Sequence, residues 1–213
     1  SELYFSIDPN KFQYYKKNIN NELFFNFLLT DETHLNHNIF ETIKVIRNQK
    51  FKNVINIESL ISIKYLIILI LKTLFLKIQY NFNFDNFHIN GLSFKKEIKF
   101  FYLISCLNRL KLDIYNQGIS LFLKKFNIKT IHMYLFEYSF GFYLIKKIKN
   151  FSKKIKINGY QHGVFSENLM WFDILRLIKN KKEYLPNKII TSNIYSAEDY
   201  RKKLGSITIE TIK

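Results

Sequence analysis

The chain has 213 residues, which suits one domain and is enough to bury a hydrophobic core. Its 47% hydrophobic and 23% charged residues, with only 6 Gly and 2 Pro, exclude a disordered or linker-rich protein. The formal net charge of +16 leaves two interpretations open: a field that attracts polyanions, or lysines that AT-rich codon usage has spread over a solvated surface.

The first half of the chain is predicted to be helical and irregular. Thr30 and Asp31 can cap a first helix, and residues 53–57 form a short apolar segment typical of a strand. Helical patterns follow over residues 60–80, 94–112 and 116–126, and an Asn-rich and aromatic stretch over residues 81–91 is expected to be a loop or an edge strand.

The segment over residues 60–80 is the most apolar part of the chain. Lys64 and Lys72 interrupt it, and the uncharged run over residues 65–71 is far shorter than the about 20 residues that span a bilayer. Two interpretations remain. The segment is a buried helix, or it lies on a membrane surface with its lysines toward the lipid phosphates.

The second half alternates strand and helix patterns. Strands are predicted over residues 129–136, 154–160 and 187–191, and helices over residues 138–150, 168–180 and 196–204. This alternation is typical of a parallel sheet with right-handed crossovers, so we expect an α/β, Rossmann-like sheet with flanking helices and a helix-rich N-terminal part. The domain is predicted over residues 1–205. Residues 206–213 are interpreted as the start of a link to a second domain, or as a last strand.

Polar residues follow each strand of the second half. Ligands of open parallel sheets bind beyond the carboxyl ends of the strands, so these residues are the candidate site. They are Glu137 after the first strand, Tyr160, Gln161, His162 and Gly163 at the second, and Ser192 and Asn193 after the third.

His162 is the leading candidate for a catalytic role. In a turn at a strand end it can act as a general base or bind a phosphate or a sugar hydroxyl, although it could also just bond a loop carbonyl. Glu137 can orient His162 or serve as an acid or base, or it can cap the helix that follows it.

Other chemical signals are weak. His34 and His37 have a spacing that can chelate zinc, but no third ligand stands at a known spacing, so no metal site is predicted. Cys106 is expected to be a small buried apolar residue. The basic run over residues 146–156 fits a helix C-terminus, or a surface for anionic lipid or nucleic acid. With no cysteine pair and no signal peptide, we expect a cytoplasmic protein.

Three short motifs carry a family resemblance. They are MYLFEYS over residues 133–139, NGYQHGVFS over residues 158–166 and YLPNKIITSN over residues 184–193. Together they resemble bacterial surface-carbohydrate (O-antigen or capsule) biosynthesis proteins, which are similar to the two-domain GT-B glycosyltransferases. Two departures stand out: the sequence Phe140-Gly141-Phe142 replaces a Trp-Glu pair, and Asn187 replaces an Asp.

The resemblance implies the N-terminal, acceptor-side half of a glycosyltransferase at the cytoplasmic face of the inner membrane. The donor would be a nucleotide-sugar and the acceptor a lipid-linked molecule or a polysaccharide, with no metal cofactor required and nucleic acid not expected as a partner. His162 would be the base, with Glu137 beside it. Substrate contacts would come from Tyr160, Gln161, Gly163, Ser166, Glu167, Ser192 and Asn193. The alternative is a non-enzymatic basic α/β module that binds nucleic acid or an anionic membrane surface.

Overall fold

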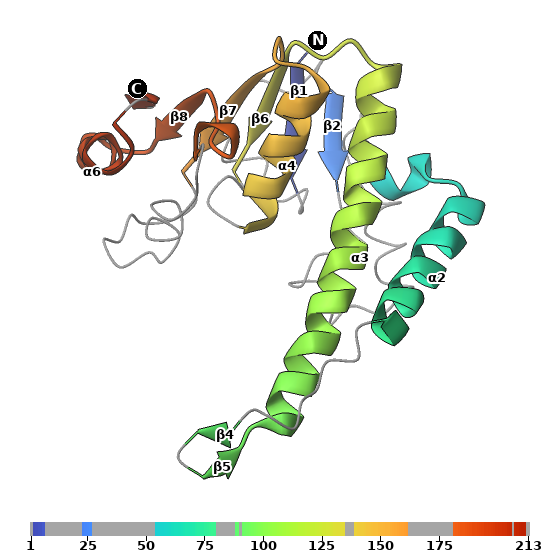
Figure 1. The fold of residues 1–213 in the computed structure, drawn as a ribbon. Helices are drawn as coiled ribbons and strands as arrows, with labels where there is room; N and C mark the ends of the chain where they lie inside the picture. The colour runs from blue at the N-terminus through green and yellow to red at the C-terminus, as the bar shows by residue number, and fades with distance from the viewer. Residues whose placement is uncertain are drawn as a thin grey trace.

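The computed structural model describes residues 2–6, 23–26, 54–79, 88–89, 91–134, 139–161, 181–205 and 207–211. These residues form an α/β fold with a parallel sheet flanked by helices, as the sequence predicts (Figure 1). The helices predicted after Thr30 and over residues 168–180, together with His34 and His37, lie outside the described residues.

The sheet runs in the order β3-β2-β1-β6-β7-β8-β9, and every neighbouring pair of strands is parallel. The direction of this order reverses between β1 and β6, which is the arrangement of a Rossmann-type sheet at its switch point. The strands are β1 Glu2–Ser6, β2 Leu23–Asn26, β3 Val54–Asn56, β6 Thr130–Met133, β7 Lys156–Tyr160, β8 Lys188–Thr191 and β9 Thr208–Thr211.

The predicted strands over residues 53–57, 129–136, 154–160 and 187–191 are confirmed as β3, β6, β7 and β8. The sequence does not indicate β1 and β2. Of the two interpretations of the C-terminal segment, a last strand is what residues 208–211 form, because β9 pairs with β8 along its whole length.

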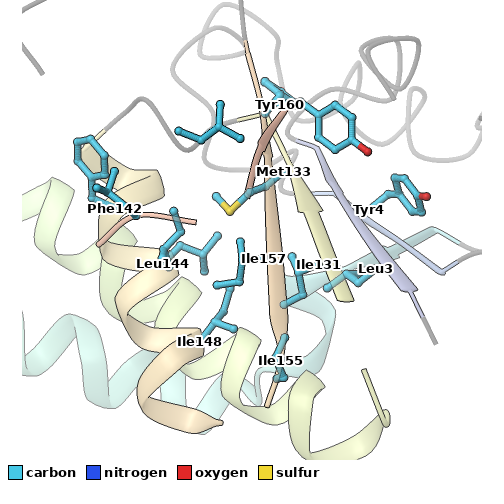
Figure 2. Close-up of a cluster of buried hydrophobic side chains, with 14 of the residues drawn as sticks. Leu3, Tyr4, Ile131, Met133, Phe142, Leu144, Ile148, Ile155, Ile157 and Tyr160 are labelled. Atoms are coloured by element: carbon cyan, nitrogen blue, oxygen red, sulfur yellow. The ribbon is translucent and has the colours of Figure 1, made fainter. Parts of the chain in front are cut away.

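One face of the sheet carries the hydrophobic core. Side chains alternate between the two faces of a strand, so Leu3, Ile131 and Ile157 share one face. Helix α4 Ser139–Phe151 covers that face, and its buried Leu144 and Ile148 lie against the strands (Figure 2). Helix α6 Ile194–Leu204 packs on β8 and β9. The predicted helices over residues 138–150 and 196–204 are therefore confirmed.

Two helices and a hairpin form an arm that leaves the sheet (Figure 1). Helix α2 Ile63–Gln79 follows a 3-10 turn, η3 Ile57–Leu60, and packs beside helix α3 Lys95–Lys125. Between them, β4 His88–Ile89 pairs antiparallel with β5 Leu92–Ser93 at the far end of the arm. Gly91 has φ 79°, a left-handed conformation that glycine adopts without strain.

Three predictions about the arm are wrong. The break expected between residues 112 and 116 is absent, because the buried ring of Tyr115 packs against Phe140 and holds α3 helical through these polar positions. Cys106 is half-buried rather than buried, because α3 at that point has left the core. Helix α2 is not a buried helix, because Ile63, Ile67 and Leu71 are each more than half exposed.

Candidate functional site

The carboxyl edge of β6, β7 and β8 is the predicted location of the site. These three strands are consecutive neighbours and parallel, so their carboxyl ends lie at one edge of the sheet. Tyr160, Gln161, Ser192 and Asn193 are described at this edge. The other predicted site residues, Glu137, His162, Gly163, Ser166 and Glu167, lie outside the described residues.

Gln161 connects the ends of two strands to a helix. Its side-chain amide donates to the Ser196 hydroxyl at 3.1 Å, and its side-chain oxygen accepts the Ser192 backbone N–H at 3.2 Å and the Ser192 hydroxyl at 3.3 Å. Its own backbone N–H donates to the Ile190 carbonyl at 2.9 Å. Gln161 is buried and bonded on both sides of its amide, so in this structure its side chain fixes the loop that follows β8 rather than facing solvent.

Asn193 is the N-cap of helix α6. Its side-chain oxygen accepts the Ser196 backbone N–H at 2.8 Å, which satisfies one of the helix's first amide groups. The buried Thr191 hydroxyl lies near two carbonyl oxygens, 3.1 Å from that of Asn193 and 3.2 Å from that of Glu210. Ser192 and Asn193 are exposed, so the structure presents both residues to solvent beside the N-terminus of α6.

A second polar cluster lies on the face of the sheet opposite α4. His132, in the middle of β6, stacks on the Tyr4 ring with centroids 4.3 Å apart and planes within 3° of parallel. Its Nδ1 is 3.0 Å from the Tyr160 hydroxyl, and its Nε2 is 3.5 Å from Glu2 Oε2. The Tyr4 hydroxyl donates to the same carboxylate oxygen at 3.1 Å. Figure 2 shows Tyr4 and Tyr160 pointing away from the α4 side of the core.

This Glu2–His132–Tyr160 cluster spans three neighbouring strands. When Nε2 carries the proton toward the carboxylate, Nδ1 is left to accept the Tyr160 hydroxyl proton, which fixes the orientation of the phenol. Protonation of His132 would turn the Glu2 contact into an ion pair. The cluster therefore fixes the Tyr160 ring at the end of β7, where this predicted substrate contact is buried.

Sequence reasoning missed this cluster, and His132 is not among the predicted site residues. The alternation of β6 gives part of the signal, because His132 must point away from the face of Ile131 and Met133. The rest comes from the pairing of β1 with β6, which joins residues far apart in the chain.

Two lysines of the basic run over residues 146–156 form hydrogen bonds within the protein. Lys146 Nζ donates to the Tyr184 hydroxyl at 2.5 Å, and this hydrogen bond raises the pKa of Lys146. Lys149 Nζ donates to the carbonyls of Lys182 and Leu185 at 2.8 and 2.5 Å, and burial lowers the pKa of Lys149. These three hydrogen bonds connect the last turns of α4 to the segment before β8.

Asn187 attaches the start of β8 to β7. Its side-chain oxygen accepts the Ile157 backbone N–H at 2.9 Å, and its backbone N–H donates to the Ile157 carbonyl at 2.8 Å. A carboxylate oxygen could accept the same bond. Asn187→Asp should therefore leave the attachment of β8 to β7 intact.

Within the described part of the chain, no three His, Cys, Asp or Glu side chains are grouped as metal ligands would be. No protein-family model matches the sequence, and comparisons with curated proteins and with solved structures found no significant match. The fold and the residues at its carboxyl edge therefore carry the functional argument.

Proposed function

We propose that this chain is the acceptor-side half of a GT-B type glycosyltransferase that moves a sugar from a nucleotide-sugar to a lipid-linked or polysaccharide acceptor. The observation that carries the proposal is the parallel adjacency of β6, β7 and β8 next to the switch point. The family-like motifs follow these three strands, so the strand order supports a shared site at one edge of the sheet.

The proposed reaction is a displacement at the anomeric carbon of the donor sugar. His162 takes the proton of the acceptor hydroxyl, and the acceptor oxygen forms the new bond to the anomeric carbon. The bond from that carbon to the phosphate oxygen breaks, and the nucleoside diphosphate leaves with both electrons. Glu137 orients His162, and the N-terminus of α6, capped by Asn193, favours negative charge at the same edge.

The test is nucleotide release by the full-length protein. We expect release from one member of a nucleotide-sugar panel, dependent on a lipid-linked acceptor extract. The variant His162→Ala should lose at least about 100-fold in rate, which is the usual contribution of a general base. Glu137→Gln should lose less, because it leaves the base in place.

A matched control separates loss of the base from loss of the fold. His88→Ala removes a histidine of the β4–β5 hairpin, at the far end of the arm from the sheet, and should retain the rate. Absence of release with every donor would reject the transferase function. Release that His162→Ala retains would reject only the assignment of the base.

A further inference from the structure

Helix α2 exposes a face that is almost entirely apolar. Ile63, Ile67, Leu71 and Phe75 recur every four residues and are 76%, 52%, 59% and 57% exposed. At 100° per residue these four lie on the side of the helix opposite Leu69, whose side chain is buried. A helix that is hydrophobic all round normally has neighbours on every side, so the outer face of α2 is a surface without a partner among the residues that the structure describes.

Large apolar side chains are also exposed on the hairpin and at the start of α3. Leu92 of β5 and the adjacent Phe100 and Phe101 of α3 are all more than half exposed. Among residues 91–114, none whose side-chain burial is described is buried, so this part of α3 lies outside the core. The arm is long for a surface feature, since residues 95–114 of α3 alone extend roughly 30 Å.

Lysines accompany these apolar side chains. Lys64 and Lys72 are exposed on α2, and Lys95, Lys96 and Lys99 are exposed in the first turns of α3, where Glu97 is the one acidic residue. Lysine stems can lie along an apolar surface while their ammonium groups reach outward to anionic groups. Exposed Ile, Leu and Phe with flanking Lys is the composition of a helix that inserts one face into an anionic bilayer.

We infer that the α2 and α3 arm docks on an anionic membrane surface. The charge of the arm favours a membrane over a second copy of the chain. Self-association through this surface would bring the five exposed lysines of one copy close to the same five lysines of the other. Phospholipid headgroups instead neutralise these lysines, at about 1 kcal/mol for each lysine near the surface. No helix in the described ranges is long and apolar enough to cross a membrane. The arm therefore lies in the interface, with the outer face of α2 toward the acyl chains.

The experiment is co-sedimentation of the full-length protein with vesicles of phosphatidylcholine alone or with 30% phosphatidylglycerol. We expect binding to the anionic vesicles that weakens as salt is raised. The double variant Ile67→Ser/Leu71→Ser should bind at least about tenfold more weakly, because it removes the inserted apolar groups. Lys64→Gln/Lys72→Gln should bind roughly 30-fold more weakly, from the loss of two headgroup contacts.

Two control variants carry the same chemical changes elsewhere. Ile194→Ser/Tyr195→Ser removes two exposed apolar side chains of α6, and Lys153→Gln/Lys154→Gln removes two exposed charges at the turn after α4. Both should bind the vesicles within about twofold of the wild type, because neither pair lies on the arm. Equal losses for the arm and control variants would mean that net charge alone drives binding, and would overturn the proposal.

The other occupants give distinguishable results. A dimer that forms without lipid and is lost in Ile67→Ser/Leu71→Ser would assign the surface to a second copy of the chain. Failure to bind either kind of vesicle would also overturn the proposal. These readouts do not depend on nucleotide release, so the proposed transferase activity and the proposed membrane surface can fail separately.

Discussion

The sheet with α4 and the arm with α2 have similar apolar residues, but α4 buries them in the core and α2 exposes them. In α4, Ile145 and Ile148 are fully buried against the strands, whereas in α2 the isoleucines at positions 63 and 67 face solvent. Both helices have apolar residues at helical spacing, but among the described residues only those of α4 are covered, by the sheet. Hydrophobic periodicity thus fixes the type of an element and one of its faces, but it does not reveal what packs against that face.

The largest expected difference is in the cost of truncating an isoleucine. Ile157→Ala in the centre of the sheet should lower the free energy of unfolding by about 2–5 kcal/mol, since it leaves a cavity in a closed core. Ile67→Ala in the arm should change it by less than about 0.5 kcal/mol. Urea denaturation of both variants measures the two costs. Equal costs would show that the outer face of α2 is covered in the free protein.

A smaller effect is expected at the polar edge of the sheet. Gln161→Ala leaves the Ser192 N–H and the Ser196 hydroxyl without their partner and should cost about 1–3 kcal/mol in unfolding free energy. Gln117→Ala on α3, where the glutamine is only half-buried, is the matched control and should cost less. If Gln161→Ala keeps full stability but loses substrate binding, the residue is a ligand contact and its bonds within the protein are incidental.

The cap of α6 gives an effect of about 1 kcal/mol. Asn193→Ala removes the acceptor for the Ser196 N–H and should destabilise the protein by that amount. Asn193→Asp keeps an acceptor oxygen and should restore most of the stability in thermal unfolding. An Asp variant as unstable as the Ala variant would indicate that the cap bond contributes little.

The smallest effect is the alkaline pH dependence of the two lysines on α4. The pKa of Lys146 is raised on folding, so its contribution to stability is complete below its ordinary pKa of 10.5 and is lost as pH rises through the higher folded value. The pKa of Lys149 is lowered by burial, so its charged form costs stability that is regained as pH approaches 10.5 from below. As pH rises, the difference in unfolding free energy between the wild type and Lys146→Gln should therefore become smaller. The difference between the wild type and Lys149→Gln should instead change in favour of the wild type. Urea denaturation at several pH values measures these differences. Unfolding free energies of the wild type and both variants that change with pH in parallel would contradict both predicted directions.

The sequence predicts the C-terminal half of the sheet, where each strand is indicated by its own residues and by those that follow it. Strands β6, β7 and β8 are short β-rich runs, each followed by a helix or by polar turn residues, so neighbouring segments define one another. Strand β1 is missed because one of its two partners, β6, comes from a distant segment, as the pairing of Leu3 with Ile131 shows. The Glu2–His132–Tyr160 cluster is missed for the same reason, and the roles of Glu137 and His162 stay predictions.

The position of β1 has a consequence for how the chain is made. This strand lies at the centre of the sheet, yet its partner β6 follows roughly 125 residues later, so at about 5–20 residues per second a ribosome needs on the order of ten seconds between them. During that interval the central strand has an open edge, and the two halves of the sheet cannot join. Biosynthesis therefore leaves one edge of an apolar strand unpaired, and chaperone binding to the nascent chain should be strongest before residue 134 has left the ribosome.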